Sequence, residues 1–295
     1  MKTLSVRFYK RLILIILALL ILIPTVLWIY TAGQNAKLRS QLEGKDPTVP
    51  SNSGANLPGG AEAIEYQTAY PELYSAVQIS NQRVQANDTV YITFDSDISA
   101  NTLQILDTLD EYGVKATFFV NGTSDAEEQS IMREIVNRGH SIGLRSYSNS
   151  YQEIYQSVSA FLDDFNQIYN LVYEVTGARA EIFRFPAGSI NAYNSGIYQE
   201  LIAEMLRRNF VFFDWNVSGE DTMVDGMTAE TVQSSVVSGM EGLQRGIVLL
   251  RDTAEKTAVA DALPGILIDL QNMGYSFQPL TAAVRPVVFS YNSAP

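Results

Sequence analysis

Cysteine is absent from the 295 residues of this chain. Disulfides, zinc–cysteine sites and thiol nucleophiles are therefore excluded. Histidine occurs once, as His140. Histidine is the commonest metal ligand and a frequent general base near neutral pH, and one copy cannot supply a two-histidine metal site. We expect His140 to be a hydrogen-bonded core residue and not a ligand.

Positive charge is scarce beyond the first 45 residues. Residues 1–45 carry seven Lys and Arg and one Glu, so the chain totals of 20 basic and 32 acidic residues leave 13 and 31 for the rest, a net charge of −18. Nucleic-acid binding needs clustered cations, so nucleic acid is not expected as a partner. A neutral ligand such as a glycan meets no such penalty. Hydrophobic content is 46%, which predicts a packed core.

One long apolar run stands near the N-terminus. Residues 12–30 form 19 nearly unbroken apolar positions, which as a helix would span roughly 28 Å, close to the thickness of a bilayer core. Four basic residues precede the run and favour a cytoplasmic N-terminus. A cleaved signal peptide is the alternative, but its apolar core is normally shorter. We expect a cytoplasmic tail at 1–11, an anchor in the cell membrane at 12–30 and an extracytoplasmic remainder.

A linker and one large domain follow the apolar run. Residues 31–60 are rich in Pro, Gly, Ser and Asn and lack periodicity, which is typical of a flexible linker. Residues 61–295 are expected to form a single domain with its core at 86–284. The core alternates strand-like and helix-like segments, which predicts an α/β fold with a mostly parallel sheet or barrel. Ser124 and Glu127 match a capping box, and residues 151–177 read as one long amphipathic helix.

Polar residues follow the predicted strands at five places. They are Asp95 to Asp97, Arg145 to Asn149, Arg184 to Gly188, Asp214 to Asp221, and Arg251 with Asp252. In a parallel barrel the carboxyl ends of the strands converge on one face, where active sites are built. Taken singly, each of these residues is better explained as a cap or turn residue. Five clusters in register at strand ends favour a shared pocket.

The segments that carry these clusters resemble a known family. "YITFDSDISANTLQILDTLDEYGVKATFFVNG", "GHSIGLRSYSNS", "IFRFPAGSIN", "FDWNVSGED" and "IVLLRDTAEKTAVADALPGIL" are similar, in order and spacing, to the five motifs of the polysaccharide deacetylases, the NodB-homology group or carbohydrate esterase family 4. The resemblance covers roughly residues 86–284. It implies an irregular (β/α) barrel and metal-dependent removal of acetyl groups from peptidoglycan, chitin and related glycans.

Most residues at the family's catalytic and metal-ligand positions differ in this sequence. Asp95 stands at the position of the catalytic base, while Ser96, Arg145 and Asn149 stand at the three metal-ligand positions. Arg251 stands where the family has a histidine that acts as the general acid. Arginine does not release its proton near neutral pH and cannot replace that acid. Because the ligands are replaced, no cofactor is expected, and we expect an arginine guanidinium to take the cation's place beside Asp95.

The scaffold positions of the motifs are kept. By resemblance, Arg184 orients the catalytic aspartate, and Pro186, Asp214, Trp215 and Asp252 belong to the substrate groove. The sequence therefore predicts a membrane-anchored, extracytoplasmic deacetylase-like protein that has lost hydrolysis and binds cell-wall glycan or an envelope protein.

Two alternatives remain open at this point. The first is an active hydrolase, acting on carbon–nitrogen bonds of acetylated glycans, with a non-standard site centred on Asp95, Asp97 and Asp252. The second is a metal site built from Asp97, Asn149 and water, since hard cations accept oxygen ligands.

Overall fold

A computed structural model describes residues 64–77, 83–84, 86–219, 228–255 and 257–290. The compact unit that contains them comprises residues 63–295. The expected tail, anchor and linker all lie outside the described residues, and so do Glu220 and Asp221 of the fourth polar cluster. Within the described part of the chain, no helix is both long and apolar enough to cross a membrane.

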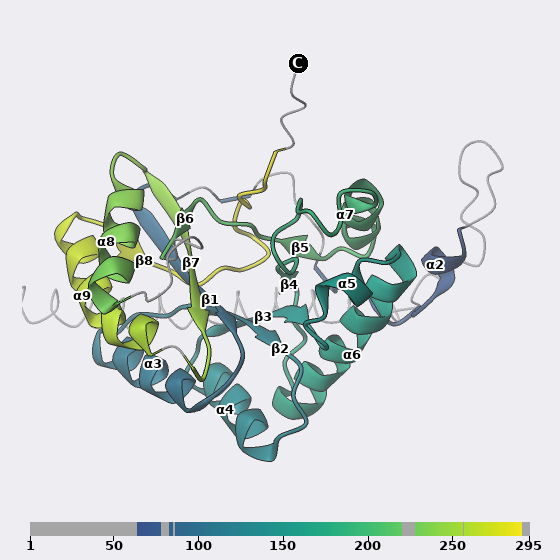
Figure 1. Ribbon diagram of the computed structural model, residues 1–295, viewed down its shortest axis with the longest axis horizontal. Coiled ribbons are helices and arrows are strands. Elements are labelled where there is room, and N and C mark those ends of the chain that lie inside the picture. Colours follow the sequence, from purple (N-terminus) through teal and green to yellow (C-terminus); the bar gives the residue numbers. More distant parts are fainter. Residues whose placement is uncertain (1–63, 78–82, 85, 220–227, 256, 291–295) are drawn as a thin grey trace, which may run out of the picture. The chain divides into compact units, whose positions relative to one another are not determined.

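A single parallel sheet forms the centre of the unit (Figure 1). Its strands run in the order β5-β4-β3-β2-β1-β7-β6, and β8 pairs with the start of β1. The strands are β1 Thr89–Ser96, β2 Thr117–Asn121, β3 Ser141–Ser146, β4 Ile182–Phe183, β5 Val211–Phe212, β6 Val217–Ser218, β7 Arg245–Asp252 and β8 Ser276–Phe277. The sheet curls into a half-barrel, which confirms the predicted α/β barrel class.

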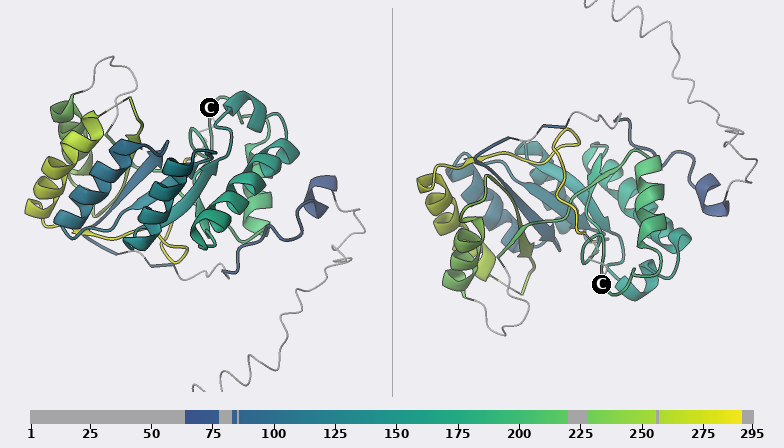
Figure 2. Two further views of the ribbon diagram at one scale, coloured as in Figure 1. Left: turned by 90° about the horizontal axis from the view of Figure 1, so that it is seen from below. Right: turned by 90° about the horizontal axis from the view of Figure 1, so that it is seen from above.

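Helices cover the outer face of the sheet in a row (Figure 2). In the row α8 packs on α9, α9 on α3, α3 on α4, α4 on α6 and α6 on α7. The helices are α2 Glu65–Thr68, α3 Ala100–Glu111, α4 Ala126–Asn137, α5 Tyr151–Ile154, α6 Val158–Thr176, α7 Tyr198–Arg207, α8 Ala229–Met240 and α9 Ala258–Asn272. This arrangement follows from the βα alternation, because each helix returns the chain to the start of the next parallel strand.

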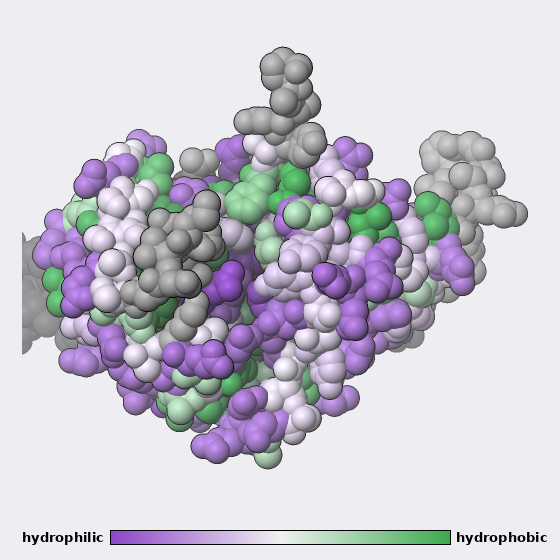
Figure 3. All heavy atoms as spheres, in the orientation of Figure 1, coloured by the Kyte–Doolittle hydropathy of each residue, from purple (hydrophilic) through white to green (hydrophobic). Residues whose placement is uncertain are grey.

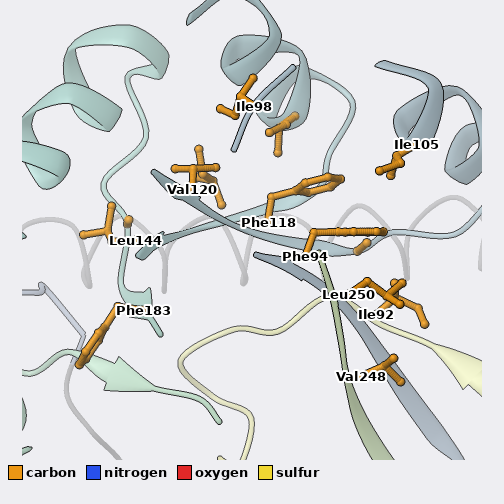
Figure 4. Packing of buried hydrophobic residues seen from close by; sticks show 14 of the residues in the cluster. Ile92, Phe94, Ile98, Ile105, Phe118, Val120, Leu144, Phe183, Val248 and Leu250 are labelled. Atoms are coloured by element: carbon orange, nitrogen blue, oxygen red, sulfur yellow. The ribbon is translucent and has the colours of Figure 1, made fainter. Parts of the chain in front are cut away.

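Side chains of β1 divide between two cores, because successive residues of a strand point to opposite faces. Ile92 and Phe94 pack toward the helices in the larger core, together with Val248 and Leu250 of β7 (Figure 4). Tyr91 belongs to the smaller core on the inner face of the half-barrel. Asp95 shares the parity of Tyr91. The alternation therefore directs Asp95 inward.

Two local predictions are wrong. Helix α4 is capped by Asp125 and not by Ser124, because one Asp125 oxygen accepts the backbone N–H groups of Glu127 and Glu128. The long helix predicted over 151–177 is two helices, α5 and α6. Ser157 between them has an extended backbone, and its hydroxyl accepts the N–H of Ala160, so it starts a new helix.

Candidate functional site

The register of the central strands brings the predicted site residues together. Asp95 lies opposite Phe119 of β2 and opposite Arg251 of β7. The pairing of β2 with β3 shifts by one residue at Val120/Asn121, just before the strands end. Such an irregularity re-aims side chains at the rim of a barrel. Asn121 and Arg145 therefore reach the same inner corner as Asp95.

Asp95 is held between two guanidinium groups. Nη1 of Arg184 donates to Oδ1 of Asp95 at 2.9 Å, and Nε of Arg145 donates to Oδ2 at 3.1 Å. The three side chains are 8%, 0% and 5% exposed for Asp95, Arg184 and Arg145. Removing charges from water is costly, and close pairing is what offsets that cost. The expected guanidinium beside Asp95 is thus present, and it belongs to Arg145.

Arg145 binds further polar groups in addition to Asp95. Its Nη1 donates to Asn121 Oδ1 at 3.1 Å and to Asn149 Oδ1 at 2.8 Å, and its Nη2 donates to Tyr151 Oη at 2.6 Å. Burial lowers the pKa of Arg145, but the neighbouring Asp95 outweighs it with help from Tyr151 and Asp97, so the pKa lies above its ordinary value. The guanidinium is therefore a fixed cation within a ring of oxygen atoms.

Arg184 is completely buried and contacts four groups. Besides its bond to Asp95, its Nε donates to the carbonyl of Phe213 at 3.0 Å, and its guanidinium lies 4.3 Å from the ring centre of Phe119. The ring centre of Trp215 lies 5.5 Å from the same guanidinium. Burial lowers the pKa of Arg184. These contacts give Arg184 the orienting position that the sequence motif implies.

The loop after β3, which carries Asn149, is fixed by a buried carboxylate on α6. Oδ2 of Asp164 accepts from the Ser146 hydroxyl at 2.8 Å and from the Tyr147 N–H at 2.9 Å. Its Oδ1 accepts from the Ser148 N–H at 2.7 Å. Asn149 then adopts a left-handed backbone with φ of 56°, a conformation that asparagine tolerates well. Asp164 thereby positions the side chain that binds Arg145.

Asp252 lies at the end of β7, opposite Ser96. One of its oxygens, Oδ2, accepts hydrogen bonds from Ser96 Oγ and Thr102 Oγ1, both at 2.6 Å. Burial raises the pKa of Asp252 to about 6, although both hydroxyls act in the opposite direction. Its carboxylate therefore contacts the start of α3, whereas that of Asp95 contacts the two arginines. The structure does not join Asp252 to Asp95 in one constellation.

Asp97 is exposed at the mouth of the site. It accepts a short hydrogen bond from the Asn121 side chain, and its N–H donates to the carbonyl of Asp252 at 2.8 Å. The side-chain oxygen of Asn149 accepts a hydrogen bond from Arg145. One oxygen of Asp97 and the side-chain oxygen of Asn149, two of the atoms of the alternative metal site, thus already accept hydrogen bonds from Asn121 and Arg145.

The groove-wall residues form a second polar cluster. Asp214 is completely buried and accepts the Ser189 N–H at 2.8 Å, the Ser189 hydroxyl at 2.5 Å and the Phe289 N–H at 2.6 Å. Burial raises its pKa against these three donors. The carbonyl of Pro186 accepts from Tyr155 Oη at 2.7 Å. This network fixes the wall formed by the loop after β4.

His140 lies in the core, away from the site. It is 5% exposed, its Nδ1 accepts the N–H of Ala116 at 3.2 Å, and its ring packs edge-on against Phe118. Burial lowers its pKa to about 4, so the ring is neutral at pH 7. The expected structural role of His140 is confirmed.

The sequence motifs did not predict three residues of the site. Asn121 ends β2 and satisfies the same strand-end criterion that selected Asp95. Tyr151 is the first residue of α5, and nothing local marks it. Asp164 lies next to Phe165 on the buried stripe of α6, and an acidic residue on an apolar stripe is a usable signal of a buried partner.

Comparison with known proteins agrees with the motif reading. The polysaccharide deacetylase family model matches residues 82–205. The catalytic domain of a peptidoglycan N-acetylglucosamine deacetylase from Eubacterium rectale superposes with a TM-score of 0.68 at 35% identity, covering 72% of this chain and 98% of that chain. The protein belongs to the polysaccharide deacetylase family.

Two further proteins are similar to this chain. YheN of Bacillus subtilis, named as a polysaccharide deacetylase, is 26% identical over 251 residues, 84% of this chain and 86% of that protein. A CE4 family pseudoenzyme from Bacillus anthracis shares the fold, with a TM-score of 0.56 and 19% identity over 66% of this chain and 64% of that one.

Family membership corrects the expectation about cofactors. Polysaccharide deacetylases are metal-dependent, so the expectation of no cofactor, drawn from the replaced ligands, is wrong. The residues at the three family ligand positions do not fit a metal as they stand, since Ser96 donates to Asp252 and Arg145 is itself a cation bound to Asn149. Over the described ranges, no group of three or more His, Cys, Asp and Glu side chains is arranged to hold a metal.

Proposed function

We propose that this protein binds cell-wall glycan at the cell envelope and does not hydrolyse it. One observation carries the proposal, the clamping of Asp95 between Arg145 and Arg184. A general base needs a free lone pair directed at the proton that it removes. Both oxygens of Asp95 are already bound to guanidinium groups. Each oxygen keeps a further lone pair, but a proton taken up there would neutralise the carboxylate and leave both buried guanidinium groups without their counter-charge.

The acid position supports the same conclusion. Arg251 is the residue in register with Asp95 on β7 and occupies the place of the family's proton donor. A guanidinium stays protonated in proteins. A general acid typically contributes about 10²–10⁴ in rate, and this contribution is lost with arginine at the position. The loss of base and acid functions together favours binding over hydrolysis.

The charge and surface of the site favour a neutral polar ligand. Arg145 and Arg184 are matched by Asp95 and by Asp97, which lies close enough to raise the pKa of Arg145. The face in Figure 3 is mostly hydrophilic, and apolar side chains appear on it as small separate patches. Broad apolar patches mark protein-binding surfaces, and the coloured atoms visible on this one face form none.

Aromatic rings lie beside both arginines of the site, as expected for a ligand with apolar ring faces. Tyr151, which accepts a hydrogen bond from Arg145, packs edge-on against Tyr193 at 5.5 Å between ring centres. Tyr193 is 50% exposed. The ring centre of Trp215 lies 5.5 Å from the Arg184 guanidinium. Relatives are named for action on peptidoglycan N-acetylglucosamine, which supports this sugar class as the ligand.

We also propose that residues 12–30 anchor the protein in the cell membrane with the domain outside the cytoplasm. The length of the apolar run and the basic residues before it support this topology. The anchor would hold the site close to the cell wall.

Binding to acetylated chito-oligosaccharides tests the proposed function. Calorimetry on the full chain in detergent should detect binding, and Tyr193→Ala should weaken it about tenfold, which corresponds to about 1.4 kcal/mol. Tyr173→Ala is the matched control, since Tyr173 is a 42% exposed tyrosine on α6, a different element. No binding by the wild type, with retention of a proteinaceous envelope component instead, would favour a protein partner.

A further inference from the structure

The C-terminal residues 287–290 lie across the wall of the site. In Figure 1 the yellow C-terminal stretch leaves β8 and crosses toward β4 and β5. The N–H of Asp214 donates to the carbonyl of Val287 at 2.9 Å, and the N–H of Phe289 returns a hydrogen bond to Oδ2 of Asp214 at 2.6 Å. Both hydrogen bonds therefore join the C-terminal segment to Asp214, the residue that precedes Trp215.

Phe289 covers Trp215 directly. The two rings meet edge to face, with centres 4.8 Å apart and planes at 74°. The Phe289 ring also lies on the backbone of Gly188, where an added Cβ would approach within 2.4 Å of a ring carbon. Gly188 has φ of 89°, which disfavours other residues. The absence of a side chain at 188 is what allows the ring to approach.

Trp215 connects this contact with the centre of the site. Its ring lies 5.5 Å from the Arg184 guanidinium, and Arg184 in turn binds Asp95 at 2.9 Å. A ligand that extends along the wall from Asp95 would reach Trp215 next. Phe289 occupies part of the surface that such a ligand would use.

Two main-chain hydrogen bonds and one ring contact hold the segment, and all four of its residues are only partly buried or exposed. Val288 is 49% exposed, and Phe289 is only partly buried. Segments with few buried contacts open at much lower free energy than the fold as a whole. When Phe289 leaves, Asp214 keeps both hydrogen bonds from Ser189, so its carboxylate is not stranded. A sugar hydroxyl could then donate to the oxygen that Phe289 releases.

We propose that residues 287–290 are an autoinhibitory strap: Phe289 packs against Trp215 at the surface that a sugar ring takes when an extended glycan binds. The inference rests on the proposed glycan-binding function. Glycan binding at this wall then requires release of the strap, and the affinity of the free site exceeds that of the strapped one.

The test uses the full chain in detergent micelles with Trp28→Phe, because the sequence contains only two tryptophans and Trp215 then becomes the sole reporter. Chitotetraose is titrated against Phe289→Ala, with Val288→Ala as the matched control from the exposed neighbour. Phe289→Ala should bind about 3–10-fold more tightly, the range expected from losing one aromatic pair. Without ligand, its Trp215 fluorescence should be more strongly quenched by acrylamide. Thermal unfolding monitors folding of both variants.

The outcomes separate the two proposals. Equal affinity of Phe289→Ala and the parent overturns the strap and leaves glycan binding intact. Weaker binding by Phe289→Ala makes Phe289 part of the binding wall and also overturns the strap. Absence of binding by every variant overturns both proposals. Hydrogen exchange at the Phe289 amide should become faster when chitotetraose is added to the parent, and slower exchange would contradict release.

Discussion

Asp95 binds two guanidinium groups at the end of β1, and each of its oxygens accepts one hydrogen bond. The motif pattern identified both the retained aspartate and the arginine at a ligand position. Electrostatics then predicted their pairing, since clustered carboxylates need a nearby cation. Which arginine would make the pair, and that Asn121 and Tyr151 would complete its shell, depended on the β2/β3 register shift, which has no signal in the sequence.

The two members of this pair should differ in their effect on stability. Asp95→Ala leaves two buried guanidinium groups without their carboxylate and should lower the free energy of unfolding by about 3–5 kcal/mol. Arg145→Ala should cost less, about 1–3 kcal/mol, because Arg184 still neutralises Asp95 and hydrogen bonds are the main loss. Denaturant unfolding measures both, with Arg133→Ala on the exposed face of α4 as a control that leaves the midpoint unchanged. A larger loss for Arg145→Ala than for Asp95→Ala would contradict the shared clamp.

Asp252 predicts a specific dependence of stability on pH. Its folded pKa of about 6 lies above the ordinary value of 3.8, so the folded state binds the proton more tightly than the unfolded state. Its contribution to stability is therefore full below about pH 4 and is lost as pH rises through 6, by about 3 kcal/mol. Asp252→Asn should remove this loss, so the variant gains stability relative to wild type between pH 4 and 7. A difference that stays constant over this range would show that Asp252 does not titrate there.

At the scale of elements, the sequence predicted most helices and the strands β1, β2, β3 and β7, because long apolar periodicities dominate there. Strands β4, β5, β6 and β8 have only two residues each. These short strands are defined by pairing with neighbouring strands of the sheet, which the local sequence pattern does not show. The break at Ser157 could have been found, since serine before a helical stripe is an N-cap signal.

Helix α6 should hold the loop after β3 through one residue. Asp164→Ala should remove the acceptors of the Tyr147 and Ser148 amides and speed their hydrogen exchange at least tenfold, equivalent to about 1.4 kcal/mol. Asp163→Ala is the matched control, because Asp163 is the adjacent aspartate and is exposed. Unchanged exchange at both amides in Asp164→Ala would rule out this positioning role.

At the scale of the whole molecule, the family and barrel class were predictable because five motifs occur in order along more than half of the chain. The path of the C-terminal strap was not, since residues 287–290 carry no periodicity and their contacts on Asp214 and Gly188 are distant in sequence. The anchor at 12–30 remains a prediction.

Topology can be tested on intact protoplasts. Added protease should degrade residues 46–295, because the proposed anchor places them outside the membrane. An antibody to the C-terminus should then lose its signal on blots, while a cytoplasmic marker protein stays intact. Protection of the C-terminal signal in protoplasts that remain sealed would reverse the proposed orientation.

Release of acetate from acetylated chito-oligosaccharides in the presence of divalent metals shows whether the protein hydrolyses the glycan that it binds. The comparison is between the wild type and a variant with Ser96→Asp, Arg145→His, Asn149→His and Arg251→His, which returns the family residues; activity has been restored by mutation in a CE4 family pseudoenzyme. The wild type should bind the oligosaccharide and release no acetate above the buffer level, whereas the restored variant should release it. Metal-dependent acetate release by the wild type that is abolished by Asp95→Asn would show that the protein is an active hydrolase with Asp95 in its site.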